Sequence, residues 1–240
     1  MSTETLNAAS TIAALVEADP ARVRIFERLG IDFCCRGNRP LAEACGELGL
    51  DAGAVLRELL EPAAGAAPAP AVNDWESLPV TGLVDHILAT HHAFLQRELP
   101  RLEALMEKVL GAHGDDHPEL AELDQVFARL HKEINEHMYK EEAILFPAIR
   151  AIVQGQVPSL RGPIQVMLEE HLHAGAELRR MRELTGGYAV PAGGCRSYRA
   201  LLEGLAAVEA DLHLHIHKEN HVLFPRVLSP GEPVPVSRAG

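Results

Sequence analysis

The apolar and polar positions of the chain predict four long amphipathic helices in its C-terminal two thirds. They run near residues 77–110, 118–154, 161–185 and 195–228, and the breaks between them are short and rich in Gly and Pro. Long helices joined by such brief connections favour an up-down-up-down four-helix bundle. We therefore expect an all-α protein whose bundle occupies residues 74–229.

Residues 1–61 predict a small helical module in front of the bundle. Asp19, followed by Pro, marks a helix start and Gly30 a stop, and two further short helices follow, the second capped by Asp51. Residues 62–73 form an Ala/Pro linker with nothing to pack, which we expect to let the module swing toward the bundle. Residues 230–240 predict a disordered tail.

The composition excludes several classes of partner. Of the 240 residues 47% are apolar and 4% aromatic, and the formal net charge of -12 comes without any Lys/Arg-rich block. Nucleic acid and anionic membranes are therefore not expected as partners. The chain opens without the layout of a signal peptide, and no apolar run approaches ~18 residues, so we expect a cytoplasmic protein.

An eleven-residue segment occurs twice, 78 positions apart, as HMYKEEAILFP from His137 and HIHKENHVLFP from His215. Each copy places a Glu, Glu141 or Glu219, four residues after its first His. This spacing puts an imidazole and a carboxylate on one helix face, about 6 Å apart along the axis. One such pair is common on solvated helices, but two copies in matching apolar frames predict a duplicated metal site. Glu142, one residue off this face, is expected to lie outside the ligand set, and the closing Phe-Pro predicts a kink or early helix end.

The remaining ligand candidates lie on the other two bundle helices. His86 and His171 close the similar segments LVDH and LEEH, at an offset of 85. Together with the two repeats they supply four imidazoles and two carboxylates, enough for two metals with both Glu bridging. Such mixed nitrogen and oxygen ligands suit iron or manganese and lack the thiolates of structural zinc.

An acidic residue precedes each repeat by one turn, Glu133 before His137 and Asp211 before His215. These acids can hydrogen-bond a ligand His or relay protons from the surface. They can equally belong to a solvated acidic turn. Both interpretations stay open from the sequence.

Several other histidines compete for ligand roles. On the last helix the repeat selects His215 over a second four-residue register that is formed by His213, His217 and His221. We expect the histidines of the remaining bundle positions at the surface or just behind the ligands: His91, His92, His131 and His173.

An adjacent cysteine pair, Cys34 and Cys35, lies in the Gly-flanked loop GIDFCCRGNRP. Neighbouring cysteines cannot easily bond to each other, so functional or buried thiols in a reducing compartment fit better. Arg36 and Arg39 beside the pair are expected to favour the thiolates. The functional interpretation is thiols that exchange with a substrate or pass nitric oxide or iron to the bundle. The alternative is two small buried residues.

The motif H-x-x-x-E-E-x-I-L-F-P and the loop D-F-C-C-x-G together resemble the repair-of-iron-centres family, also called iron–sulfur cluster repair di-iron proteins. In that family a hemerythrin-like bundle follows a double-cysteine module, and the resemblance covers nearly the whole chain. It implies two non-haem irons with an oxo or hydroxo bridge and carboxylate bridges. It also implies six ligands, namely His86, His137, Glu141, His171, His215 and Glu219.

The resemblance further implies a protein of the nitrosative and oxidative stress response that helps repair damaged iron–sulfur clusters by donating iron. One alternative is a nitric oxide scavenger, or a reductase that forms nitrous oxide at the di-iron site. Another is an oxygen or redox sensor, against which the lack of any visible output domain counts. The expected partners are damaged iron–sulfur proteins, with nitric oxide or O2 as small ligands, and the protein is expected to be a monomer or homodimer.

Overall fold

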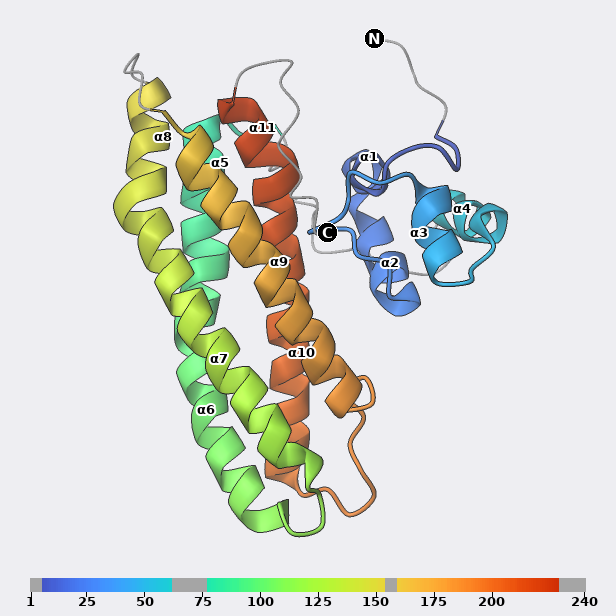
Figure 1. Ribbon diagram of the computed structural model, residues 1–240, viewed down its shortest axis with the longest axis vertical. Coiled ribbons are helices and arrows are strands. Elements are labelled where there is room, and N and C mark those ends of the chain that lie inside the picture. Colours follow the sequence, from blue (N-terminus) through green and yellow to red (C-terminus); the bar gives the residue numbers. More distant parts are fainter. Residues whose placement is uncertain (1–5, 62–76, 154–158, 229–240) are drawn as a thin grey trace.

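The computed structural model describes residues 6–61, 77–153 and 159–228, and its regular elements are helices (Figure 1). The first bundle helix comprises α5 (Val80–Ile87), η2 (Leu88–His92) and α6 (Ala93–His113). The second comprises α7 (Glu119–Lys140), η3 (Glu141–Leu145) and α8 (Phe146–Val153). The third is α9 (Arg161–Leu184), and the fourth comprises α10 (Arg196–His217), η4 (Lys218–Leu223) and α11 (Phe224–Val227). The predicted all-α bundle is confirmed.

The bundle helices pack as an up-down arrangement requires. α7 lies along α9, and α10 lies along α6. After α9, Gly186 and Gly187 adopt positive φ angles of 56° and 78°, which glycine reaches without a steric penalty. The Gly-Gly break read from the sequence is therefore where the chain turns back into the fourth helix.

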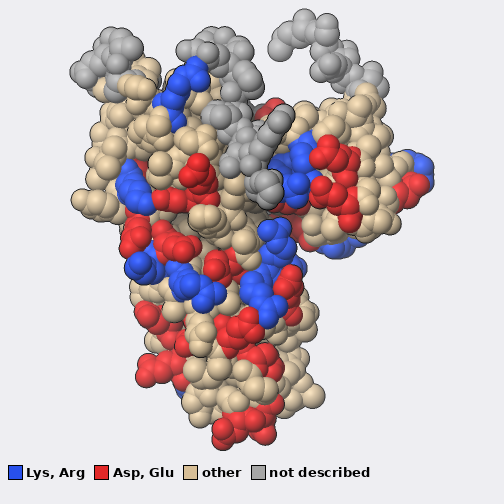
Figure 2. Space-filling view, viewed as in Figure 1, with Lys and Arg blue, Asp and Glu red and all other residues tan. Residues whose placement is uncertain are grey.

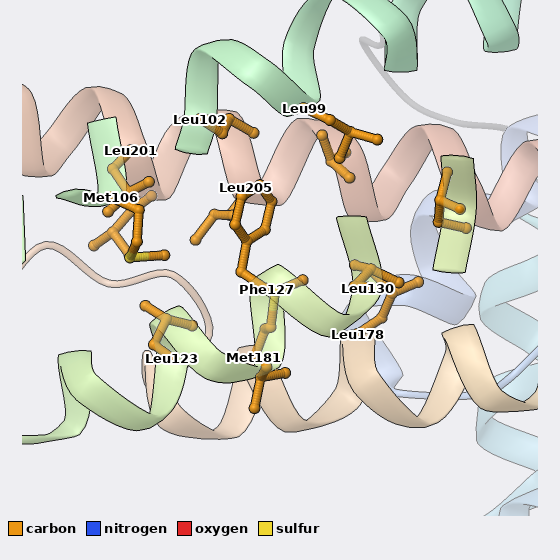
Figure 3. Close-up of a cluster of buried hydrophobic side chains, with 14 of the residues drawn as sticks. Leu99, Leu102, Met106, Leu123, Phe127, Leu130, Leu178, Met181, Leu201 and Leu205 are labelled. Carbon is orange, nitrogen blue, oxygen red and sulfur yellow. The ribbon is translucent and has the colours of Figure 1, made fainter. Parts of the chain in front are cut away.

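Two apolar clusters lie along the bundle, and a polar layer separates them. The larger cluster, which includes Leu99, Phe127 and Leu205, fills the half toward the α6–α7 connection (Figure 3). The smaller one, which includes Leu83 and Phe224, fills the opposite end. Burial of these side chains supplies the main drive for helix association. It also fixes the height at which each helix presents polar side chains inward.

Three of the bundle helices contain a π-helical segment at this polar layer, namely η2, η3 and η4. Pro147 and Pro225 follow η3 and η4, and proline leaves the carbonyl one turn earlier without its N–H partner. The wider π turn accommodates that loss, so the expected kink takes the form of a π turn and the helix continues. In η2 the Thr90 hydroxyl donates to the carbonyl oxygen of His86 at 2.6 Å and so competes with the backbone N–H groups for that acceptor.

The N-terminal module consists of α1 (Ile12–Ala18), η1 (Pro20–Arg22), α2 (Val23–Leu29), α3 (Leu41–Glu47) and α4 (Ala52–Leu60). The predicted caps are confirmed: the Asp19 and Asp51 side chains accept the backbone N–H of Ala21 and Ala54. Gly30 ends α2 with a φ of 69°. Helix α1 was not predicted, and its apolar face completes the module core.

The module is docked on the fourth bundle helix, beside the polar layer (Figure 1). Ile216 of α10 is 1% exposed and belongs to the same apolar cluster as Phe26 and Phe33. The expectation of a module that swings toward the bundle is thus corrected, because apolar burial already holds the two together. The predicted linker 62–73 and tail 230–240 lie outside the described residues.

The surface carries both signs of charge over the bundle. Figure 2 shows acidic and basic side chains interspersed along this face rather than gathered in one block. None of the helices in the described ranges combines the length and the apolar character that a membrane span requires.

Candidate metal centre

Six buried side chains from the four bundle helices converge in the polar layer. They form two triads, and within each triad the ligand atoms lie within 4.8 Å of one another. The first triad is His92, Glu141 and His215, and the second is His137, His171 and Glu219. Both carboxylates are 0% exposed. Each triad offers two imidazoles and one carboxylate.

The two carboxylates lie between the triads. Glu141 Oε2 is 3.2 Å from His92 Nε2 in its own triad and 3.4 Å from His137 Nε2 in the other. Glu219 Oε2 is 3.1 Å from His171 Nε2, and its Oε1 is 3.2 Å from His215 Nε2. Each carboxylate therefore faces an imidazole of both triads, the position that a bridging ligand takes.

The chemistry of the donor set fits metal cations. Both carboxylate oxygens of Glu141 and of Glu219 are buried without a hydrogen-bond partner, as are His92 Nε2 and His215 Nε2. Such atoms each cost about 1–3 kcal/mol when nothing satisfies them. Burial and then the neighbouring Glu219 carboxylate raise the pKa of Glu141. Divalent cations between the carboxylates would satisfy these atoms and remove the repulsion.

Three of the four imidazoles are held from behind through Nδ1. His92 Nδ1 lies 2.8 Å from Glu142 Oε1, and His137 Nδ1 lies 2.9 Å from Glu170 Oε2. The third, His171 Nδ1, donates to Asn220 Oδ1 at 2.8 Å. A hydrogen bond at Nδ1 fixes the tautomer that leaves Nε2 free to bind a metal.

Glu142 therefore has a role at the site that the sequence did not predict. It is 40% exposed and stands outside the triads, as expected, but it accepts the His92 hydrogen bond. Its counterpart in the second repeat is Asn220, which accepts from His171. The residue after each bridging-position Glu thus performs the same task in both halves of the bundle.

Of the six residues predicted as ligands, the structure brings five together and leaves His86 out. His86 is half-buried, and its Nε2 lies 2.9 Å from Lys218 Nζ rather than near either triad. His92, which was expected at the surface or behind the ligands, takes the place foreseen for His86. The offset of 85 between His86 and His171 came from a match of only four residues, and it did not allow for the extra residue that the π turn of η2 inserts. His92 and His171 are 79 positions apart, close to the 78 of the repeat, and this spacing was the missed signal.

The acidic pair before the repeats does not contact the triads. Glu133 is exposed at the rim of a pocket of about 190 Å³ beside His137 and His171, and Glu170 occupies the Nδ1 of His137 instead. Asp211 Oδ1 lies 2.9 Å from Nδ1 of the buried His91. The solvated interpretation therefore fits Glu133, whereas Asp211 belongs to a buried group with His91.

The cysteine loop lies directly against the second triad. Cys35 Sγ donates to the carbonyl oxygen of His171 at 3.3 Å. The carbonyl oxygen of Cys34 accepts two hydrogen bonds, one from Asn220 Nδ2 at 3.0 Å and one from His221 Nε2 at 2.9 Å. Asn220 therefore bridges a ligand candidate of the bundle and the backbone of the cysteine loop.

The predicted thiolate character does not hold for Cys34. The hydrogen bond with Cys35, burial and the nearby Asp32 raise the pKa of Cys34 well above its usual value. Arg36 and Arg39, which were expected to favour the thiolates, point to Glu47 at 3.4 Å and 2.7 Å. Their charge is thus compensated away from the sulfur atoms.

The second repeat differs from the first where it meets the module. Tyr139 and Ala143 of the first copy are exposed, and their counterparts are His217 and His221. His217 Nδ1 donates to the carbonyl oxygen of Phe33 at 3.5 Å, and His221 holds Cys34. Two histidines of the alternative register on the fourth helix, His217 and His221, therefore contact the N-terminal module and not the triads.

Comparison with known proteins agrees with this architecture. The model of the hemerythrin HHE cation binding domain matches residues 83–227, and a domain of unknown function (DUF542) matches residues 8–63. The first match defines the chain as a hemerythrin-like protein with a cation-binding domain.

Curated relatives narrow the class further. The chain is 36% identical over 218 residues to the iron-sulfur cluster repair protein YtfE of Yersinia pseudotuberculosis serotype O:1b (strain IP 31758). It is 35% identical over 218 residues to YtfE of Yersinia pestis (strain Pestoides F). Both alignments cover 91% of this chain and 96% of the relative. The chain belongs to the YtfE family of iron–sulfur cluster repair proteins.

Proposed function

We propose that the two triads hold two iron ions and that the protein uses this centre to repair damaged iron–sulfur clusters by donating iron. The proposed ligands are His92, Glu141 and His215 for one iron and His137, His171 and Glu219 for the other. The observation that carries the proposal is the position of Glu141 and Glu219, each facing imidazoles of both triads. Four-helix bundles hold carboxylate-bridged iron pairs in this manner.

The donor set also indicates how the centre would release iron. Two imidazoles and one carboxylate per metal are a ligand set that suits non-haem ferrous iron. Glu142 and Glu170 are only partly buried, and both accept from ligand candidates. Solvent at these carboxylates gives an incoming ligand a route to weaken the bond of His92 or His137.

The relatives' names describe iron–sulfur cluster repair, and this supports the same role here. The recipients would be damaged iron–sulfur proteins of the cytoplasm. Cys34 and Cys35 would exchange with the recipient or with nitric oxide, because they lie between the second triad and the module surface. Nothing in the described residues favours nitric oxide reduction over repair.

The proposal is tested anaerobically with the di-ferrous protein. Iron transfer to an apo ferredoxin, followed by the return of cluster absorption, is the expected result. Nitrous oxide is measured in a parallel reaction with nitric oxide. Stoichiometric nitrous oxide without iron transfer would favour the reductase instead, and a Glu141→Gln protein that still transfers iron normally would show that the triads are not the source.

A further inference from the structure

A third set of metal-binding side chains lies in the cysteine loop, outside the two triads. Asp32, Cys34 and Cys35 bring one oxygen and two sulfur atoms within 4.8 Å of one another. Cys34 Sγ is 3.6 Å from Cys35 Sγ and 3.5 Å from Asp32 Oδ1. Asp32 is held in place because its Oδ1 accepts the backbone N–H of Cys35 at 2.9 Å.

These separations match the edges of a tetrahedron around one metal ion. With metal–sulfur bonds of about 2.3 Å and metal–oxygen bonds of about 2.0–2.2 Å, tetrahedral angles give ligand separations of roughly 3.5–3.8 Å. The two sulfur atoms are too far apart for a disulfide, which needs about 2.05 Å. The two separations that involve Cys34 Sγ are therefore already those of a tetrahedral metal site.

The fourth coordination position has space. A cavity of about 100 Å³ reaches Asp32, Cys34 and Cys35 and continues to Arg182 and His213 on the bundle. This volume holds several water molecules or a small exogenous ligand. Three protein ligands with one open position are the arrangement by which catalytic metal sites bind water or a substrate.

The loop is also coupled to the iron centre of the bundle. Gly175 allows the close approach, because a Cβ at this position would lie 3.1 Å from Cys35 Sγ. A metal ion on the loop would replace the proton of Cys35 and so remove its hydrogen bond to the carbonyl oxygen of His171. Loading of the loop would then loosen the contact that holds this side of the second triad.

We propose that Asp32, Cys34 and Cys35 form a third metal site, which binds a single thiophilic divalent ion next to the two-metal centre. Binding releases the two thiol protons to solvent and needs no oxidant or reductant. In the cell this site would hold ferrous iron that passes from the bundle to the recipient protein. That last role rests on the proposed function, whereas the site itself does not.

The test is a titration of the full-length protein with Co²⁺, after the bundle has been loaded with iron and the thiols have been reduced. Cobalt bound by thiolates gives an intense near-ultraviolet charge-transfer band. We expect one further ion per chain with this band. Cys34→Ser and Cys35→Ser should abolish the band, and Asp32→Asn should weaken binding at least tenfold.

Cys195 provides the matched control. It is exposed, and its Sγ lies 3.2 Å from His113 Nε2, so it is the thiol most able to bind cobalt adventitiously. Cys195→Ser should leave the titration unchanged. A band that disappears in Cys195→Ser, or that survives in both loop variants, would overturn the proposal. Iron content and thermal unfolding of each variant report whether it has folded.

The same experiment separates this site from the proposed function. No third ion in a protein that retains two irons and transfers them would refute the loop site alone. A loop that binds cobalt in a protein whose bundle holds no iron would refute the two-iron proposal and leave the loop site standing.

Discussion

Replacement of Asn220 by Leu tests the link between the metal centre and the cysteine loop. Asn220 is 5% exposed and makes two hydrogen bonds, one with His171 Nδ1 at 2.8 Å and one with the Cys34 carbonyl oxygen at 3.0 Å. Leucine fills similar space but leaves the buried Nδ1–H of His171 without an acceptor, which costs about 1–3 kcal/mol. The Cys34 carbonyl oxygen keeps its bond from His221, so little is added there.

The effect of a lost orienting residue on metal affinity gives a free-energy cost of similar size. Loss of the residue that orients a ligand His lowers metal affinity about 10–100-fold, or roughly 1.4–2.8 kcal/mol. Competition with a chelator measures this change in the full-length protein. His221→Ala is the matched control, because it removes a bond to Cys34 and none to His171. We expect it to increase the rate of thiol modification while iron affinity stays the same. An Asn220→Leu protein that holds iron as tightly as the original would refute the reasoning.

Three further changes test other contacts of the site. Gly175→Val should push Cys35 away, since even a Cβ would lie 3.1 Å from its Sγ, and faster thiol modification at unchanged iron content would show this. Glu170→Gln should weaken the hold on His137 Nδ1 and lower iron affinity about 10–100-fold in the same chelator assay. Cys34→Ala combined with Cys35→Ala should keep the visible absorption of the iron centre but lose cluster repair. Loss of iron in proportion to activity would contradict that division of roles.

The bundle could be predicted from the sequence because its information is local. The apolar spacing and the Gly/Pro breaks of the bundle act within a few residues, as do the caps at Asp19 and Asp51 in the N-terminal module, and the structure contains each of these features. The repeated segments likewise placed Glu141 and Glu219 in the polar layer. Helix α1 was missed because its short apolar run has no strong start signal other than Thr11.

Whether His86 or His92 faces the other ligand candidates depends on the helix geometry between the two residues, which the apolar pattern does not reveal. A single π turn rotates the face that a helix presents, and η2 begins two residues after His86 and includes His92. The Thr90 hydroxyl that accompanies the turn is a weak signal in the sequence. The docking of the cysteine loop is a long-range contact, and its only trace was the replacement of Tyr139 and Ala143 by histidines in the second repeat.

The most direct test of the central claim is iron analysis of the purified protein with its His92→Ala and His86→Ala variants, each loaded anaerobically. We predict two irons per chain for the original protein and for His86→Ala, because His86 contacts Lys218 and neither triad. His92→Ala removes one of three ligands of the first triad and should retain at most one. Two irons in His92→Ala together with a loss in His86→Ala, or one zinc per chain in the original protein, would contradict the account.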